Sequence, residues 1–403
     1  MTTTPARERL RPGLAGDRTG AVVVGGDYQG LGIVRSLGRR GVPVIVVDDE
    51  PSIARYSRYA AGHRTVQDLH DPGRALESLL ELGRQLQPQR WVLFPTREET
   101  VVLVAEHRDV LARLFRVPTP GMDVIRAAWD KRETYRIARA AGVPTPRFWL
   151  PSSRAELDEV DLSSPVVVKP AIKENFIYAT GVKAWRADDM AQLLDAYDRA
   201  RRVVDPSEII VQEMVPGGGD RQLSYCAFFK QGRPVATMTT RRLRQHPSDF
   251  GRASTYVRTE RLPELTDPSE RFLRTIGYYG LVEMEYKVDP RDDIPKLLDV
   301  NARTWGYHTL GASAGVDFAD LLYRDQTGEP VHGGEAREGV GWLRWSTDLP
   351  NAGRDLWHHR LRAREYLRSL RQVDTEAVLS LHDPLPGLAE VVLLPSLAWR
   401  RGL

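Results

Sequence analysis

Residues 281–301, LVEMEYKVDPRDDIPKLLDVN, contain two apolar runs separated by a polar segment. The runs Leu281–Val288 and Leu297–Val300 predict two β-strands, and Asp289–Asp293 predicts the turn that joins them. Because strands joined by so short a connection usually lie side by side, this stretch predicts a two-stranded ribbon within an α+β domain.

Four polar residues alternate along the two strands of this ribbon. Residues two apart on a strand share one face, so Glu283 lies on the same side as Glu285, and Asp299 on the same side as Asn301. Pairing of the strands would bring three carboxylates and one amide together, and such hard oxygen ligands suit Mg²⁺. The alternative is a solvated face of the ribbon, but the apolar residues around these acids are typical of buried strands.

The segments on either side of the ribbon predict further strands and few helices. A helix at about Asp188–Arg201 interrupts the strands, and a later one is predicted at Gly353–Leu370. Runs of strands with segregated helices favour an α+β fold for this part of the chain. The other predicted strands are Val166–Val168, Val182–Trp185, Ile209–Gln212, Leu223–Phe229 and Pro234–Thr239.

The beginning of the chain has a different pattern, in which strands and helices alternate. Strand, helix and strand within about thirty residues predict a β-α-β unit with parallel strands, and therefore a doubly wound α/β domain over 20–122. Its predicted elements are strand Ala21–Val24, helix Gly30–Arg40, strands Val42–Val47 and Trp91–Phe94, and a helix that runs from a capping box at Thr96 and Glu99 towards Phe115.

The second domain is predicted to begin with a helix. Asp130 and Glu133 have the spacing of a helix N-cap and its third residue, and the helix from Lys131 ends at Gly142. We therefore expect a disordered tail at 1–19, an α/β domain at 20–122, an α+β domain at 123–330 and a C-terminal helical extension at 331–403.

Composition excludes several classes of function. The chain has 403 residues and a net charge of only +3, which argues against nucleic-acid binding. Its single cysteine, Cys226, excludes an internal disulfide and a multi-cysteine metal site, and this usage fits a reducing cytoplasm. No apolar stretch approaches the roughly 18 residues of a membrane helix, so we expect neither a membrane nor nucleic acid as a partner.

A glycine-rich turn follows the first predicted strand and suggests a dinucleotide loop. Gly25, Gly26, Gly30 and Gly32 do not have the G-x-G-x-x-G spacing, but Asp48 lies about where a ribose-binding acid would fall. The alternative is that the glycines only permit a tight strand-to-helix turn. An NAD(P)-dependent oxidoreductase is therefore one hypothesis, although it leaves the acidic ribbon unexplained.

Lys169 ends an apolar strand, where removing its ammonium group from water is costly without an anion. The segment Ile172–Thr180, which ends at Gly181, could fold over a phosphate and supply backbone N–H groups. Further along, the strand and hinge at 209–217 could present main-chain groups to an adenine edge, and Asp220 could accept from ribose hydroxyls. Each of these motifs alone also fits an ordinary strand end.

Several arginines follow the hinge. Arginine forks match carboxylate and phosphate geometry, although any one of these residues is equally compatible with a solvated loop. They are Arg241, Arg242, Arg244, Arg252 and, shortly after the acidic ribbon, Arg303.

Taken in order, these motifs resemble those of the ATP-grasp superfamily. The carboxylate–amine ligases related to D-aspartate ligase have the most similar pattern. The resemblance implies an N-terminal Rossmann-like domain followed by an ATP-grasp fold, in which a lid at about 145–215 and the part that follows it enclose ATP. It spans roughly residues 20–330 and rests on Asp130-Lys131, Val168-Lys169-Pro170, Gln212-Glu213-Met214-Val215, Glu285 and Asp299-Val300-Asn301-Ala302-Arg303.

The resemblance also implies roles for individual residues. Asp299 stands where the family usually has glutamate, and Ala302 replaces a common proline. The residues implied to bind ATP are Lys131, Lys169, Gln212, Glu213, Met214, Val215 and Asp220. Those implied to hold two Mg²⁺ ions, or Mn²⁺, are Glu285, Asp299 and Asn301, with Glu283 beside them, and those implied to act in catalysis are Arg303, Arg242 and Arg244.

The implied function is that of an ATP-dependent ligase, which activates a small carboxylate as an acyl phosphate and joins it to an amine. An amino acid is the expected acid. We expect a cytoplasmic enzyme, with a homodimer as the default assembly. Two alternatives stay open at this point: the oxidoreductase described above, and a nucleotide-binding sensor on the same fold that catalyses no reaction.

Overall fold

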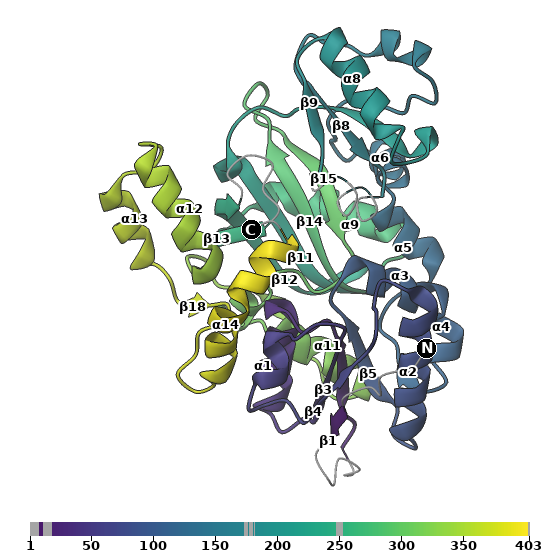
Figure 1. Cartoon of the computed structure of the whole chain (residues 1–403), viewed down its shortest axis with the longest axis vertical. Coiled ribbons are helices and arrows are strands. Elements are labelled where there is room, and N and C mark those ends of the chain that lie inside the picture. Colours follow the sequence, from purple (N-terminus) through teal and green to yellow (C-terminus); the bar gives the residue numbers. More distant parts are fainter. Residues whose placement is uncertain are drawn as a thin grey trace.

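The structure, a computed structural model, describes residues 8–10, 18–172, 176, 180, 182–246 and 253–401. Arg252 and most of the segment 172–181, which the sequence predicts to cover a phosphate, lie outside these residues. Figure 1 shows an N-terminal part in purple and blue at the bottom, a central sheet in green, a small upper part in teal, and a pair of helices that project to one side.

The N-terminal part is built on a six-stranded sheet. Five strands are parallel, as the sequence predicts, and β2 and β3 are buried along their whole length, which explains their continuous valine-rich runs. In spatial order the strands are β1 (Glu8–Leu10), β4 (Gly62–Thr65), β3 (Val44–Asp48), β2 (Ala21–Val24), β5 (Trp91–Pro95) and β6 (Phe115–Arg116). The helices of this part are α1 (Tyr28–Gly38), α2 (Pro72–Gln85), α3 (Glu98–Glu106) and α4 (Arg108–Leu111).

Two predictions for this part are wrong. The sequence predicts a disordered tail over 1–19, but residues 8–10 form strand β1, which pairs antiparallel with β4. The sequence predicts Thr96 as the N-cap of α3, but the N-cap is the next residue, Arg97. The Arg97 N–H donates to the Thr100 hydroxyl at 3.2 Å. Thr96 instead donates to the Val24 carbonyl at 2.9 Å, because it follows a buried strand beside β2.

The central sheet has eight strands. The predicted ribbon is present as the antiparallel pair β14–β15, in which Glu283 is paired with Asn301 and Glu285 with Asp299. The spatial order is β15 (Pro295–Asn301), β14 (Gly280–Val288), β11 (Gln222–Lys230), β12 (Arg233–His246), β13 (Ala253–Thr259), β17 (Gly341–Leu343) and β18 (Thr375–Glu376), and β16 (Gly334–Glu335) pairs with β12.

A second, smaller antiparallel sheet lies above the central one (Figure 1). Its strands are β7 (Phe148–Trp149), β10 (Ile209–Glu213), β8 (Val166–Pro170) and β9 (Trp185–Ala187), in that order. The helix α8 (Met190–Ala200) packs on it, and Leu193 and Tyr197 join Val166 and Val168 in one buried cluster. Strand β9 begins at the last residue of the predicted strand Val182–Trp185.

The remaining helices connect these parts or follow them. The single helix predicted at Gly353–Leu370 is in fact two helices, because His359 adopts a φ of 56° that a helix does not allow. Residues 331–401 are not only helical, since β16, β17 and β18 extend the central sheet. The helices are α5 (Met122–Trp129), α6 (Lys131–Ala140), α9 (Thr266–Thr275), α10 (Thr309–Ser313), α11 (Phe318–Thr327), α12 (Trp345–Trp357), α13 (Ala363–Leu370) and α14 (Leu385–Arg401).

Close packing joins the N-terminal part to the rest of the chain. A Cβ atom on Gly32 of α1 would lie 2.5 Å from the His308 ring, so only glycine lets α1 pack this closely against His308. On the same helix, Arg35 is buried and pairs with Asp383 at 2.9 Å. None of the described helices combines the length and the apolar character needed to cross a bilayer.

Candidate active site

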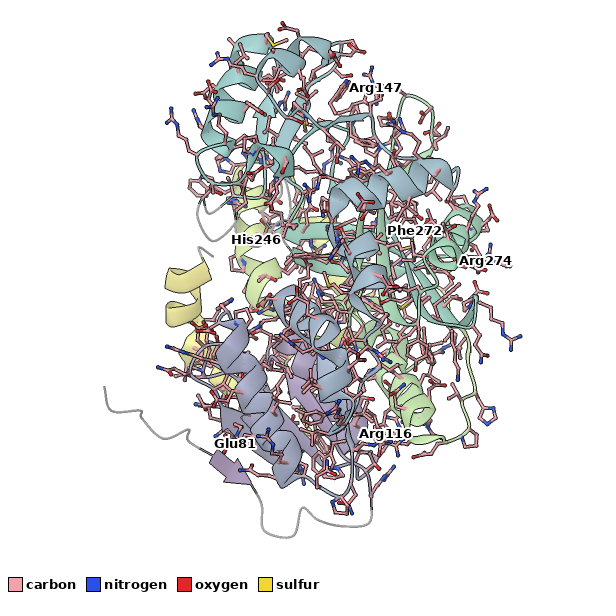
Figure 2. The ribbon with its side chains drawn as sticks, turned by 90° about the vertical axis from the view of Figure 1, so that its right-hand side faces the viewer. Glu81, Arg116, Arg147, His246, Phe272 and Arg274 are labelled. Atoms are coloured by element: carbon pink, nitrogen blue, oxygen red, sulfur yellow. The ribbon has the colours of Figure 1, made fainter. Side chains whose placement is uncertain are left out.

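A cleft of about 460 Å³ lies between the small sheet and the central sheet. Figure 2 shows both sides of this region, with Arg147, just before β7, on the upper side and His246, at the end of β12, below it. Of the residues that the sequence singles out, those that line the cleft are Lys131, Lys169, Gln212, Met214, Val215, Arg242, Glu285 and Asp299.

Two lysines of the cleft come from different elements. Lys131 is the first residue of α6, which the Asp130 side chain caps, and its ammonium group donates to Asp299 Oδ1 at 2.6 Å. Lys169 lies in β8 and donates to the Tyr135 hydroxyl at 3.0 Å. With Lys183 and Lys287, which also line the cleft, they favour the binding of an anionic ligand.

Tyr135 holds Lys169 in position. Its ring centroid lies 5.2 Å from Lys169 Nζ, and its hydroxyl donates to Gln212 Oε1 at 2.7 Å. Burial, followed by the charge of Asp299, raises the pKa of Tyr135 well above its usual value. The phenol therefore stays protonated and keeps Lys169 and Gln212 together at the wall of the cleft.

Strand β10 leaves the small sheet through a hinge. The backbone N–H groups of Glu213 and Met214 donate to the carbonyls of Arg147 and Pro165 at 2.9 and 2.8 Å, so the protein itself uses both donors. The Val215 N–H donates to no described residue, and Val215 lines the cleft. Of the main-chain donors expected to meet adenine, Val215 is therefore the one that stays available.

The Glu213 side chain does not line the cleft. It is buried between Arg147 and Arg291, whose guanidinium groups lie 3.2 and 2.6 Å from its Oε1 atom. Burial raises the pKa of Glu213, but hydrogen bonds from Arg147 and Arg291 lower it further, so that the pKa falls to about 2. Glu213 thus fixes the start of the hinge through ion pairs.

We expect Glu213 to stabilise the fold except at strongly acidic pH. Its folded pKa lies below the usual glutamate value of 4.5, so its contribution is present above that pH and is lost as the pH falls towards 2. Glu213→Gln should melt below the parent at neutral pH, and this difference should shrink as the pH falls through that interval. Glu133→Gln is the control, at a half-buried glutamate of α6 that pairs with Arg136 at the surface. A difference that stays constant with pH would contradict the role of the ion pairs.

The Asp220 side chain is not brought to the cleft. It follows Gly217, whose φ of 94° reverses the chain, and lines a neighbouring hollow with Arg221 and Arg241. Arg241 also donates to the Asp220 carbonyl at 3.2 Å. The glycines at 217–219 line the cleft instead, so the turn places the backbone there and directs the carboxylate elsewhere.

The paired strands β14 and β15 bring the four residues of the acidic ribbon together. Asn301 Nδ2 lies between two carboxylates, 3.1 Å from Glu283 Oε2 and 3.0 Å from Glu285 Oε1. Asp299 is paired in register with Glu285 and holds Lys131. Three carboxylates and one amide therefore gather at the boundary of the cleft.

Glu283 is the most buried of these carboxylates, with 4% of its surface exposed. It accepts hydrogen bonds from the Tyr307 hydroxyl and, at 3.1 Å, from Ser224. Burial, followed by repulsion from Glu285, raises its pKa to about 7. Glu283 does not line the large cleft, and its contacts fit a residue that positions Asn301.

Metal binding by this ribbon requires that its internal ion pairs rearrange. Among the described residues, no three histidine, cysteine or carboxylate groups are placed to hold a metal ion as they stand. Cations of the protein neutralise the carboxylates instead, Lys131 at Asp299 and Arg242, at 2.9 Å, at Glu285. The donor set of carboxylate and amide oxygens fits Mg²⁺ once Lys131 releases Asp299 and Arg242 releases Glu285.

A second cavity, of about 120 Å³, adjoins the cleft and shares Lys183, Arg242, Glu285 and Asp299 with it. Arg242 and Arg303 both line this cavity, and the buried Nε atom of each has no hydrogen-bond partner among the described residues. Buried polar groups are nearly always paired. Two guanidinium groups at the wall of one cavity make it suited to an anionic group.

The wall of this smaller cavity includes residues that the sequence does not single out. Tyr28 and Gln29 come from the start of α1, Tyr307 from the loop after β15, and Trp342 from β17. The Trp342 ring centroid lies 6.2 Å from that of Tyr28 and 6.1 Å from that of Tyr307. Tyr28 and Gln29 lie within the glycine-rich turn that the sequence singles out, whereas no sequence motif points to Tyr307 or Trp342.

Arg244 lies outside both cavities, contrary to the catalytic role implied from the sequence. Both contacts of its bidentate pair with Asp348 of α12 measure 2.8 Å, and it also donates to Ser369 of α13. The cause is a register shift in β12 between Arg242 and Arg244, which breaks the alternation of faces. Arg244 therefore anchors the projecting helices.

Asp48 shapes the glycine-rich turn and is not open to a ribose. Its carboxylate accepts the Gly26 N–H at 2.6 Å and a hydrogen bond from Arg97 at 3.0 Å. Burial raises the pKa of Asp48 to about 6, although Arg97 opposes this shift. The Asp48 carboxylate, which would have to bind the ribose of a dinucleotide, is already hydrogen-bonded within the protein. This removes the main support for an oxidoreductase.

No protein-family model matches the chain. Its sequence is similar to that of D-alanine–D-alanine ligase from Acidovorax ebreus, with 27% identity over 224 residues, which cover 51% of this chain and 64% of the relative. It is also similar to D-aspartate ligase from Enterococcus faecium, with 20% identity over 268 residues, 62% of this chain and 63% of the relative. The chain thus spans less than two thirds of the length of these curated relatives.

Solved structures establish the fold. The L-amino acid ligase from Bacillus licheniformis has a TM-score of 0.59 and 16% identity, over 77% of this chain and 74% of that one. The biotin carboxylase domain of the 2-oxoglutarate carboxylase from Hydrogenobacter thermophilus, solved with MgADP, has a TM-score of 0.62 and 16% identity, over 81% and 74%. The chain has the mixed α/β architecture of the ATP-grasp fold.

Proposed function

We propose that the protein is an ATP-dependent ligase that activates a carboxylate as an acyl phosphate and joins it to an amine. The observation that carries this proposal is a pair of adjoining cavities that together hold four lysines, the acidic ribbon and two arginines with unpaired Nε–H groups. The sequence similarity to D-alanine–D-alanine ligase and D-aspartate ligase supports it.

The larger cleft is the proposed site for ATP. Its volume of about 460 Å³ is that of an ordinary small-molecule site. Lys131 and Lys169 would bind the phosphates, and the Val215 N–H would donate to the adenine ring. The MgADP in the solved biotin carboxylase domain supports a nucleotide as a ligand of this fold.

Glu285, Asp299 and Asn301 would hold Mg²⁺ at the phosphate end of the cleft, with Mn²⁺ as a substitute and two ions as the full complement. When bound, the metal neutralises charge on the phosphate oxygens. Release of Asp299 then frees Lys131 to bind a phosphate oxygen. Nucleotide and metal together would thus replace the internal pair Lys131–Asp299, which predicts that they bind cooperatively.

In the proposed reaction, a carboxylate oxygen attacks the γ-phosphorus of ATP, the bond to the bridging oxygen breaks, and ADP leaves. The acyl phosphate then reacts with an amine, which forms the amide bond and releases phosphate. Arg242 and Arg303 bind the carboxylate in the smaller cavity and stabilise charge on the transferred group. The small sheet shields the site from water, which would otherwise hydrolyse the acyl phosphate.

Removing either arginine should slow turnover more than it weakens ATP binding. A hydrogen bond to a charged group contributes about 1.5–3 kcal/mol, so kcat should fall roughly tenfold to a hundredfold in Arg242→Ala and Arg303→Ala. Steady-state kinetics and calorimetry with a non-hydrolysable ATP analogue measure the two effects separately. Arg258→Ala, at an arginine of β13 outside both cavities, is the control. Full turnover in either test variant would exclude that arginine from the reaction.

ADP release, screened over pairs of amino acids and small carboxylates, tests the proposal. We expect at least one pair to give ADP only when both members are present. ATP with Mg²⁺ should also raise the melting temperature, whereas NAD should not. A rise with ATP but no ADP from any pair would favour the nucleotide-binding sensor.

The finer assignments follow from the same proposal. We take the N-terminal domain to be Rossmann-like, with Tyr28 and Gln29 contributing to the substrate side of the site. We take an amino acid as the substrate and a cytoplasmic homodimer as the working state. Light scattering of the purified protein tests the assembly.

A further inference from the structure

The arm, which we define as residues 345–371, consists of α12, α13 and the loop between them. Figure 1 shows both helices projecting from the central sheet. None of the arm residues lines the cleft or the smaller cavity. The arm is nevertheless firmly attached, because Arg244 of the central sheet pairs with Asp348 and packs over the Tyr366 ring, 5.0 Å from its centroid.

Large apolar side chains are exposed on this arm. Trp357 is 82% exposed, Leu367 is 58% exposed and Leu349 is 56% exposed. Leu349 and Trp357 are eight residues apart on α12, so they lie on one face about two turns apart. A tryptophan this exposed on a firmly anchored helix indicates an interaction surface for a protein or a membrane.

The arm is also strongly basic. Residues 345–371 contain six arginines and three acids, a net charge of +3 from six minus three, which is as large as the +3 of the whole chain. Leu367 has Arg364 three residues before it and Arg371 four residues after it, so the three share the exposed face of α13. Arg360, Arg364, Arg368 and Arg371 form no ion pair with any described residue.

We propose that the arm docks the protein onto an anionic lipid surface. Such a surface offers mobile phosphate groups to scattered arginines and an apolar layer to Trp357, Leu349 and Leu367. A projecting arm can meet a soft, flat surface without any matching shape, whereas an acidic protein would need fixed carboxylates opposite the guanidinium groups. The sequence-based expectation of no membrane partner considers only helices that span a bilayer, and surface docking requires none.

Co-sedimentation with vesicles tests this proposal on the full chain. We expect the protein to bind vesicles of equimolar phosphatidylcholine and phosphatidylglycerol, and not vesicles of phosphatidylcholine alone, with weaker binding at high salt. Each arginine near an anionic surface contributes about 1 kcal/mol, so the triple variant Arg360→Glu, Arg364→Glu and Arg368→Glu should lower the partition coefficient at least about a hundredfold. Trp357→Ala should lower it about tenfold.

A matched variant separates the arm from net charge. Arg84, Arg113 and Arg202 are exposed and lie elsewhere, and replacing all three by glutamate changes the charge equally but should leave most of the binding intact. The arm variants should keep the melting temperature and any ADP release of the parent, because their residues line neither cavity. The lipid readout does not depend on ligase activity.

Three outcomes would overturn the proposal. The first is a parent protein that does not bind the anionic vesicles. The second is an equal loss of binding in the arm variant and the matched variant. The third is equally strong binding to soluble polyglutamate that is insensitive to Trp357→Ala, which would assign the arm to an acidic protein partner.

Discussion

Replacing Asp299 by asparagine should abolish ADP formation. The change keeps the size of the side chain and removes one charge from the acidic ribbon. Asp299 holds Lys131 at 2.6 Å and is paired in register with Glu285, so it serves both the proposed phosphate site and the proposed metal site. Charge stabilisation by a metal is worth several kcal/mol, so kcat/KM should fall by about a thousandfold or more.

Two related variants make this test specific. Glu285→Gln should be nearly as severe, because Glu285 contacts both Asn301 and Arg242 at the edge of the cleft. Glu283→Gln should be milder, because Glu283 lies deeper and positions Asn301.

Stability should change little in Asp299→Asn. Removing the charge loses the part-buried pair with Lys131 but also relieves the repulsion from Glu285 on the neighbouring strand, so the melting temperature should fall by only a few degrees. ADP release and melting temperature, each with and without Mg²⁺, measure both effects. Normal Mg²⁺-dependent turnover in Asp299→Asn would rule out the metal site as proposed.

Replacing Lys169 by methionine should weaken ATP binding while the fold survives. Methionine keeps most of the apolar stem and removes the ammonium group, which lies at the wall of the cleft beside Tyr135 and Gln212. A charge-assisted hydrogen bond contributes about 1.5–3 kcal/mol, so the Kd of a non-hydrolysable ATP analogue should rise roughly tenfold to a hundredfold.

The control for this variant is Lys230→Met. Lys230 pairs with Asp325 at 2.6 Å and lines neither cavity, so its loss should leave the analogue affinity unchanged. Calorimetry on both variants, with circular dichroism to verify folding, separates a phosphate contact from a general loss of charge. Equal affinities for Lys169→Met and the parent would contradict the role of Lys169.

The acidic ribbon could be predicted from sequence because its four polar residues lie on two strands that are close together in the chain. Alternation with a period of two places Glu283 and Glu285 on one face, and the short connection places Asp299 and Asn301 on the neighbouring strand. The parallel N-terminal strands were predictable for a similar reason, since valine-rich runs alternate there with a helical pattern.

Other parts depend on geometry that local sequence does not contain. A register shift in β12 separates Arg242 from Arg244, although their spacing of two predicts a common face. The left-handed backbone at Gly217 directs the Asp220 side chain out of the cleft. Strand β13 and helix α9 are not predicted either.

The smaller cavity and the arm depend on contacts between distant segments. Tyr28 meets Trp342 only because β17 extends the central sheet towards α1. The sequence predicts only a helix in this region, and the structure shows Trp357 and Leu349 exposed on it. Long-range packing of this kind leaves no local pattern.

The central claim is that a carboxylate attacks ATP and forms an acyl phosphate. Once ADP release has identified an active pair, the most direct measurement uses a carboxylate substrate labelled with heavy oxygen, followed by mass analysis of the released phosphate. The proposed reaction predicts one labelled oxygen in each phosphate, because the amine expels the oxygen that attacked ATP. Amide formation with unlabelled phosphate would contradict the claim.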